Sequence, residues 1–203
     1  MENELEERFN IYLITFSKIL YNKISHYYII KMEYTKDETY YFHQTPNDLA
    51  KELIKKVPLV EGDKVVDTFK GEGAFYNNFP DYVEKGWSEI VEGIDYKDYE
   101  GEIDWVITNV PFRLEDEKKG KRVNSFYPLL DYYSTRVNKG IAFLGNDYCF
   151  STLTPIRMKK LNELGWYLQG YTICNVKKWR GRYFFMIFTK EKNDGINYLL
   201  GSY

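Results

Sequence analysis

The run VVDTFKGEGAFY at residues 65–76 has the residue types of a ligand-binding turn. Asp67 ends an apolar segment, and Gly71 and Gly73 follow closely. Glycine lets the backbone approach a ligand and adopt a positive φ, and a helix that starts here would offer N–H groups to an anion. A dinucleotide fingerprint would need a third glycine where Tyr76 stands, which disfavours a pyrophosphate-binding oxidoreductase. A plain tight turn between strand and helix is the alternative.

Two further acids are predicted to lie beside this turn. Asp95 is expected to end the next strand, 22 residues after Gly73, where a carboxylate can accept both hydroxyls of a ribose. Asp98 follows one turn later. Three acids around a glycine loop suit a ligand with a cationic head, a ribose and an amino-bearing base, and S-adenosylmethionine is such a ligand. The alternative for Asp95 and Asp98 is a role as surface acids.

A second candidate site is TNVPF at residues 108–112, directly after a predicted strand. The lone pair of an exocyclic aryl amine is delocalised into its ring, so such an amine is a poor nucleophile. The Asn109 side-chain oxygen and the carbonyl of Val110 could each accept one N–H and localise that lone pair, while Phe112 stacks on the base. Catalysis of this kind depends on positioning and on acceptors aimed at developing positive charge, without a strong general base.

Charge is distributed unevenly along the chain. Residues 1–110 hold 12 Lys+Arg and 22 Asp+Glu, a net of −10, whereas residues 111–203 hold 16 and 8, a net of +8. This asymmetry indicates a face that meets a polyanion, although the whole chain carries only −2. Solvated turns are the alternative for the basic segments. The candidate phosphate contacts are Lys118, Lys119, Lys121 and Arg122 in residues 115–122, and Lys177, Lys178, Arg180 and Arg182 in residues 177–182.

Strand and helix patterns alternate along the chain, which is typical of a parallel α/β sheet with helices on both faces. Thr45 is predicted to cap a helix that begins at Pro46 and extends to about Val57. The other predicted helices follow the glycine turn as far as residue 79 and cover 126–137 and 155–164. Strands are predicted at 64–67, 88–95, 104–109 and 140–145, and an antiparallel hairpin at 167–176 and 183–189.

Length and composition indicate one α/β domain over residues 31–203, preceded by a helical extension over residues 1–30. The chain has 203 residues, of which 44% are hydrophobic, so a packed core is expected. No apolar run reaches the roughly 18 residues of a membrane span, and the acidic start MENELEER is not a signal peptide. Two cysteines and two histidines are too few for a disulfide scaffold or a structural metal site. We therefore expect a soluble intracellular protein without a metal.

Five motifs in this order resemble those of the methyltransferases that modify the 6-amino group of adenine in DNA. The motifs are HQTP (43–46), DTFKGEG (67–73), GID (93–95), KDY (97–99) and TNVPF (108–112). The resemblance covers roughly residues 41–190 and departs at Val110, where the family has the first proline of Asn-Pro-Pro-aromatic. It implies a Rossmann-like class I methyltransferase fold with a mostly parallel seven-stranded sheet, S-adenosylmethionine as cofactor and a flipped-out adenine as substrate.

The resemblance also implies roles for individual residues. The catalytic pocket would consist of Asn109, Val110, Pro111 and Phe112. The cofactor contacts would be Thr45, Pro46, Asp67, Phe69, Gly71, Gly73, Asp95, Asp98 and Asn109. Nucleic acid, DNA more than RNA, is the expected partner. Because no separate recognition domain fits after Phe112, we expect a short sequence preference or a partner subunit that supplies recognition.

Two alternatives stay open from the residues alone. The same pocket suits adenine in RNA or the glutamine amide of a protein, because each offers a planar nitrogen. A non-catalytic, methyltransferase-like subunit that binds nucleic acid is the other alternative, since Val110 removes one φ restraint from the loop.

Overall fold

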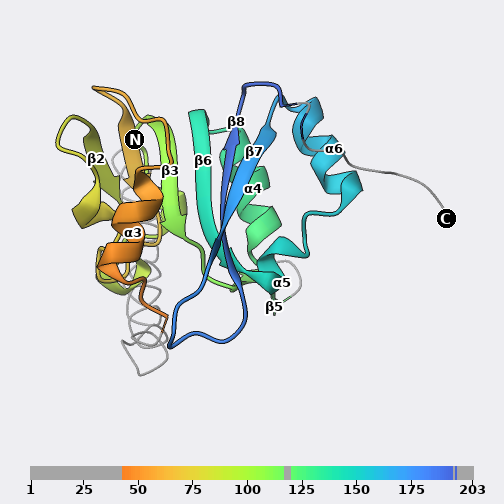
Figure 1. The fold of residues 1–203 in the computed structure, drawn as a ribbon, viewed down its shortest axis with the longest axis horizontal. Helices are drawn as coiled ribbons and strands as arrows, with labels where there is room; N and C mark the ends of the chain where they lie inside the picture. Colours follow the sequence, from red (N-terminus) through yellow and green to blue (C-terminus); the bar gives the residue numbers. More distant parts are fainter. Residues whose placement is uncertain (1–42, 117–119, 194, 196–203) are drawn as a thin grey trace, which may run out of the picture.

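The computed structural model describes residues 43–116, 120–193 and 195. The predicted extension over residues 1–30 therefore lies outside the described residues, as do Lys118 and Lys119. The described part contains a six-stranded mixed sheet with the order β2-β1-β3-β6-β8-β7 and a separate two-stranded sheet that pairs β4 with β5 (Figure 1).

The six-stranded sheet confirms the predicted α/β architecture with an antiparallel C-terminal hairpin, with six described strands where seven were expected. β1 pairs in parallel with β2 and β3, and β3 pairs in parallel with β6. β8 is antiparallel to both β6 and β7. The strands are β1 (Lys64–Asp67), β2 (Glu84–Trp87), β3 (Ile103–Asn109), β6 (Val137–Asn146), β7 (Tyr167–Cys174) and β8 (Tyr183–Thr189).

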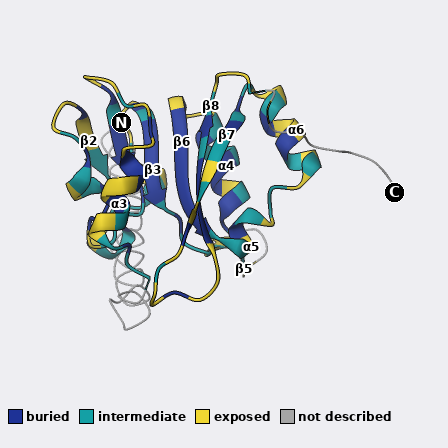
Figure 2. Ribbon diagram, in the orientation of Figure 1, coloured by how far each residue is buried: buried dark blue, intermediate teal, exposed yellow. Residues whose placement is uncertain are grey.

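Helices cover both faces of this sheet (Figure 1). Because side chains alternate along a strand, Val106 of β3 joins the core beneath α4 and α6, whereas Trp105 and Ile107 join the core beneath α3. Figure 2 shows the buried residues concentrated along the central strands and the inward sides of the helices. The helices are α3 (Asn47–Ile54), α4 (Phe126–Ser134), α5 (Asp147–Phe150) and α6 (Pro155–Glu163).

The first described helix starts later than predicted. Pro46, not Thr45, is the N-cap residue of α3, and its extended backbone (φ −60°, ψ 135°) delays the helix to Asn47. Thr45 is buried and does not cap the helix, so that prediction was wrong. In contrast, α6 begins as predicted, with Pro155 in its first turn.

The helix predicted after the glycine turn does not form. Only one short 3₁₀ turn, η1 (Tyr76–Asn78), lies in this stretch. The residues from 71 to 80 include two glycines, two asparagines and a proline, which are poor helix formers in a segment too short for propagation. The helix N-terminus expected to offer N–H groups to a ligand is therefore replaced by a loop.

The second strand also lies elsewhere. It is β2, and the residues predicted as a strand (88–95) instead contain the 3₁₀ turn η2 (Ile90–Glu92). Because β1 has only four residues, its partner ends opposite Asp67, at Trp87. Asp95 therefore does not end a strand; its side chain accepts the Lys97 N–H at the start of η3 (Tyr96–Asp98).

A hairpin follows TNVPF, in a segment where the sequence predicted neither a strand nor a helix. β4 (Arg113–Asp116) and β5 (Lys121–Asn124) pair antiparallel immediately after Phe112. The hairpin leads into α4, whose first N–H, that of Phe126, donates to Asn124 Oδ1. The hairpin thus joins the second candidate motif to the helix that covers one face of the sheet.

Candidate functional site

The candidate site lies where the strand order of the sheet reverses. From β1 the chain proceeds to β2 on one side, and β3 lies on the other side of β1. In open α/β sheets, ligands bind at such a point, outside the carboxyl ends of the strands. Asp67 ends β1 and Asn109 ends β3, and Thr108 Oγ1 donates to Asp67 Oδ1 at 2.7 Å. The two predicted motifs therefore share one edge of the sheet.

Asp67 is almost fully buried at this edge. Its Oδ2 accepts the backbone N–H of Tyr76 at 3.3 Å. Burial raises the pKa of Asp67 to about 7, although hydrogen bonds from Thr108, Tyr76 and Phe69 oppose the rise. The carboxyl group consequently ionises near neutral pH, and a cation placed beside it would favour the ionised form.

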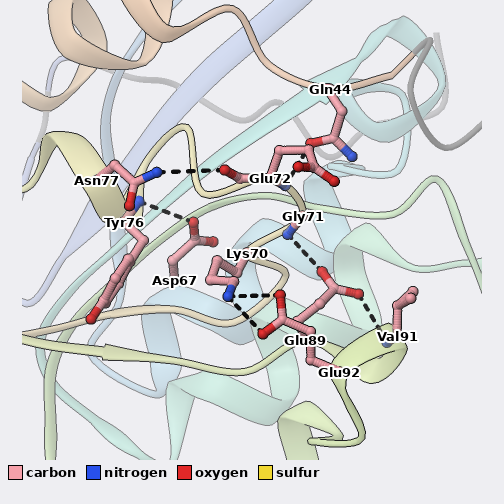
Figure 3. Close-up of polar contacts among 10 residues, drawn as sticks. All are labelled: Gln44, Asp67, Lys70, Gly71, Glu72, Tyr76, Asn77, Glu89, Val91 and Glu92. Carbon is pink, nitrogen blue, oxygen red and sulfur yellow. Dashed lines mark hydrogen bonds and ion pairs between the residues drawn. The ribbon is translucent and has the colours of Figure 1, made fainter. Parts of the chain in front are cut away.

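The glycine loop is held on two sides by polar side chains. The Gly71 N–H donates to Glu89 Oε2 at 2.6 Å, and the Glu72 N–H donates to Gln44 Oε1 at 3.0 Å (Figure 3). Gly71 and Gly73 have φ of 54° and 85°, in the left-handed region that favours glycine. A Cβ at Gly71 would lie 2.5 Å from Gln44 Oε1, so any other residue at this position would displace the Gln44 side chain from the loop.

Glu89 is the acid that follows the second strand, and sequence reasoning missed it because that strand was misplaced. Its carboxylate is buried and accepts the N–H groups of both Gly71 and Val91. Asp95 is half-buried and Asp98 is exposed. Tyr96, next to Asp95, lies 5.2 Å from the ring of Phe69, so this segment packs against the start of the glycine loop.

A pocket of about 140 Å³ lies on the glycine loop, and its lining includes Lys70, Gly73 and Asn77. Lys70 Nζ contacts Glu92 at 2.8 Å and lies 3.7 Å from the centre of the Trp87 ring. Pockets that enclose a whole small ligand have volumes of roughly 300 Å³ or more. This pocket therefore suits only a part of such a ligand.

The backbone of the TNVPF motif is fixed by hydrogen bonds. The Val110 N–H donates to the carbonyl of Leu144 at 3.1 Å and extends the pairing of β3 with β6. A proline at position 110 would have a fixed φ but no N–H to donate. Valine lacks the fixed φ and makes this hydrogen bond instead. Ser125 Oγ donates to the Pro111 carbonyl. The backbone N–H of Ser125 donates to the Phe112 carbonyl at 3.3 Å. The backbone after Asn109 is therefore held in place by hydrogen bonds although position 110 is valine.

The Asn109 amide has one end anchored and one end unsatisfied. Its Nδ2 donates to the His43 carbonyl at 3.3 Å, whereas its Oδ1 is buried with no hydrogen-bond partner among the described residues. A buried acceptor without a donor is costly and uncommon. Because the His43 carbonyl can only accept, the amide orientation is determined, and an oxygen is the atom left for a ligand that donates N–H.

The HQTP segment bridges the two motifs. The His43 carbonyl receives the Asn109 amide, while the next side chain, Gln44, receives the glycine loop. The His43 ring also lies 5.0 Å from the Phe112 ring in a perpendicular arrangement. Burial and the charge of Lys178 lower the pKa of His43, so its imidazole is neutral at pH 7. Sequence reasoning selected Thr45 and Pro46 here and missed the two residues before them.

The basic residues predicted to contact phosphates lie at the same edge. The connection between β7 and β8 (residues 175–182) extends beyond the carboxyl end of β6, because Tyr183 pairs with Asn146. Lys177, Lys178 and Arg180 are exposed there. Arg182 is also exposed, but its Nε lies 3.3 Å from Asp147 Oδ1.

The β4–β5 hairpin presents the second basic segment. Lys121 and Arg122 on β5 are exposed. Asn124 Nδ2, at the end of β5, donates to the Tyr148 carbonyl in α5, the helix that also contains Asp147. Both basic segments therefore contact α5, beside the candidate base pocket.

The described residues contain no group of three or more His, Cys, Asp or Glu that could hold a metal ion. In the same part of the chain, no helix combines the length and the apolar character needed to cross a membrane.

Several solved structures share the fold of this chain. A structure described as a class I S-adenosylmethionine-dependent methyltransferase from Listeria monocytogenes matches with a TM-score of 0.56 at 12% identity, over 83% of this chain and 66% of that one. This is the class I methyltransferase fold. A structure described as an RNA methyltransferase from Pyrococcus horikoshii matches with a TM-score of 0.53 at 15% identity, over 75% and 89% of the two chains. A precorrin-6y C5,15-methyltransferase from Geobacter metallireducens matches with a TM-score of 0.51 at 11% identity, over 78% and 95%.

At these identities the likeness establishes the class I methyltransferase fold and nothing finer. No protein-family model matches the sequence, and no curated protein matches it either. The predicted Rossmann-like class I fold is thus confirmed by the structure, whereas the substrate must be argued from the site.

Proposed function

We propose that this protein is an S-adenosylmethionine-dependent methyltransferase that methylates the exocyclic 6-amino group of adenine in DNA. The observation that carries the proposal is the buried, unsatisfied Oδ1 of Asn109, a residue that shares its neighbour His43 with the half-buried ring of Phe112. An acceptor next to an aromatic ring suits a flat base with an amino group. The class I methyltransferase fold supports methyl transfer as the reaction.

The residues at the edge of the sheet fit the cofactor. Asp67 ionises near neutral pH and suits the cationic methionyl end. Glu89 would exchange its bond with the Gly71 N–H for bonds from ribose hydroxyls, and the half-buried Asp95 would accept the amino group of the cofactor's adenine. When bound, the cofactor supplies an electrophilic methyl group. Thr45, Pro46, Phe69, Gly71, Gly73 and Asp98 complete the proposed contacts.

The chain itself would activate the amine by accepting hydrogen bonds. Asn109 Oδ1 and the Val110 carbonyl each accept one N–H, which localises the nitrogen lone pair out of the ring plane. Phe112 stacks on the extruded base. As the new N–C bond forms and the S–C bond breaks, both acceptors stabilise the positive charge on nitrogen, and one proton then leaves to water.

Incubation with methyl-labelled cofactor and separate DNA, RNA and protein pools, followed by nucleoside and amino-acid analysis, tests the proposal. We expect label in DNA as 6-methylaminopurine. Label in RNA adenine or in protein glutamine would instead support the alternative substrates. Nucleic-acid binding without transfer to any pool would identify a non-catalytic subunit.

Glu89→Gln should weaken cofactor binding by roughly tenfold or more, because a charged acceptor for two hydroxyls is lost. Asp95→Ala should weaken it less, because Asp95 is more exposed and would contact one amino group. Isothermal titration calorimetry measures both. Glu102→Gln is the control, because Glu102 is exposed and pairs with Lys64 at the start of β1, the end opposite Asp67. An unchanged affinity in either variant would remove that residue from the cofactor site.

Replacing Lys177, Lys178 and Arg180 together by alanine should reduce the slope of log affinity against log salt by about 2 to 3, because each phosphate contact releases counterions. DNA binding measured between low and moderate salt gives the slope. Arg182 is left in place because it pairs with Asp147. Lys159→Ala, on the exposed face of α6, is the control and should keep the wild-type slope. A wild-type slope in the triple variant would exclude Lys177, Lys178 and Arg180 as the phosphate contacts.

A further inference from the structure

The connection between β7 and β8 combines exposed cations with one buried ring. We call residues 175–182 the basic tip. Lys177, Lys178 and Arg180 are exposed, but Trp179 among them is only 5% exposed. The backbone N–H of Trp179 donates to the Val176 carbonyl at 2.8 Å and closes a turn. The cations therefore face solvent while the indole packs inward.

The buried indole begins a series of ring contacts that ends at the candidate base pocket. Trp179 lies 4.4 Å from Tyr183, centroid to centroid, with the ring planes inclined by 37°. Tyr183, 3% exposed, lies 6.2 Å from Phe112, and His43 lies 5.0 Å from Phe112. These separations are in the range in which aromatic pairs attract one another.

The backbone gives Tyr183 little freedom to move. It pairs with Asn146 of β6 on one side and with Cys174 of β7 on the other. In a close-packed interior such a residue transmits a displacement of its neighbour rather than absorbing it. The position of the Trp179 ring therefore influences where the Phe112 ring lies.

The charge of the basic tip also reaches the site. Lys178 is close enough to His43 to lower its pKa, and the ring of His43 contacts Phe112. The basic tip therefore lies near both aromatic neighbours of Phe112, Tyr183 and His43.

From these contacts we infer that Trp179 is a positioning residue that couples the docking of nucleic-acid phosphates on the basic tip to the position of the Phe112 ring. Phosphates held by Lys177, Lys178 and Arg180 settle the tip in one conformation. Trp179 then supports Tyr183, and Tyr183 supports Phe112 where the base must stack. Binding of the nucleic-acid backbone and positioning of the base would therefore depend on each other. The inference rests on the proposed function.

The test compares Trp179→Leu, which removes the ring but keeps an apolar side chain, with Trp179→Phe, which keeps a ring. We expect Trp179→Leu to lower kcat by roughly 10- to 100-fold through misplacement of the base, and Trp179→Phe to restore most of it. The salt dependence of DNA affinity should stay at the wild-type slope in both variants, because the cations remain. Thermal melting checks that each variant is folded.

A second measurement needs no cofactor. In a DNA duplex with 2-aminopurine in place of the target adenine, the fluorescence change on binding reports how the extruded base stacks. It should differ from wild type in Trp179→Leu and match wild type in Trp179→Phe. Trp166→Phe is the control for general destabilisation, because Trp166 is also buried but its indole N–H donates to the carbonyl of Ser134, the last residue of α4.

Three outcomes would overturn the inference. These are wild-type kcat and fluorescence in Trp179→Leu, a reduced salt slope in that variant, or an equal loss of kcat in Trp166→Phe. None of these three outcomes would contradict the proposed function, which depends only on whether wild-type protein methylates DNA. If wild-type protein methylates no nucleic acid, the proposed function fails, and the 2-aminopurine comparison still decides whether Trp179 positions the ring.

Discussion

Asn109→Ala should lower kcat by about 10²- to 10³-fold and weaken cofactor binding far less, because Asn109 is one of several proposed cofactor contacts but supplies the side-chain acceptor for the amine. The reason is that Asn109 Oδ1 is a buried acceptor with no donor in the described structure, so its hydrogen bond is available to the substrate amine. The loss would fall on the transition state, because the acceptor is needed most as positive charge develops on the nitrogen. Single-turnover methylation of DNA and calorimetry with the cofactor measure the two quantities.

Two control variants separate the acceptor from the local fold. Asn109→Asp keeps an oxygen for the amine but places a second oxygen against the His43 carbonyl, so we expect partial activity and reduced stability. Asn138→Ala removes an amide whose contact is with Asp104, outside the site, and should leave kcat unchanged. Wild-type turnover in Asn109→Ala would refute the role of this residue in activating the amine.

Asp67→Asn should remove a pH dependence of stability and weaken cofactor binding. Burial raises the Asp67 pKa from 3.8 to about 7, so the folded state holds a proton that the unfolded state has lost between those values. Stability from this group is therefore fully present below pH 4 and decreases as pH rises towards 7, by on the order of 4 kcal/mol from the pKa difference. Above pH 7 the contribution no longer changes with pH.

Urea unfolding at several values between pH 4 and 8 measures this slope in wild type and in Asp67→Asn. The variant cannot ionise, so it should lack the fall in stability that Asp67 contributes between pH 4 and 7, and its slope should be more positive than that of wild type. Asp81→Asn, at an exposed acid paired with Lys85, is the control and should keep the wild-type slope. Equal slopes in wild type and Asp67→Asn would contradict the prediction.

Cofactor binding should show the opposite trend with pH. A cationic group beside Asp67 binds best when the carboxyl group is ionised, so wild-type affinity should rise with pH towards neutrality. Asp67→Asn should lose both that rise and roughly tenfold or more of the affinity at pH 8. An affinity that does not change with pH in wild type would show that Asp67 lies away from the cationic end of the cofactor.

Elements with strong local patterns were predicted correctly from the sequence. The run KVVD gave β1 with the predicted bounds, and DWVITN gave all but the first residue of β3. The apolar run of β8 and the proline-started α6 were also placed correctly. These segments are specified by their own residues, through β-branched and aromatic composition or helix start signals, so their neighbours were not needed to recognise them.

Elements whose bounds depend on a partner were predicted wrongly. β2 lies at Glu84–Trp87 because a strand can extend only as far as β1 pairs with it, and residues 88–95 turn away despite their apolar content. Glu89 was missed for the same reason, and Asp95 was assigned its place at the end of the strand. Six of the eight residues in β4 and β5 are polar or charged, so the composition of the hairpin resembles that of a loop.

The sequence by itself determined the fold class and the two motifs at strand ends, because hydrophobic periodicity and turn residues act over a few positions. Only the tertiary structure decided that Gln44 and Glu89 hold the glycine loop, that the His43 carbonyl orients Asn109, and that Trp179 reaches Phe112 through Tyr183. These contacts join residues far apart in the chain, and their geometry depends on packing that no local pattern encodes.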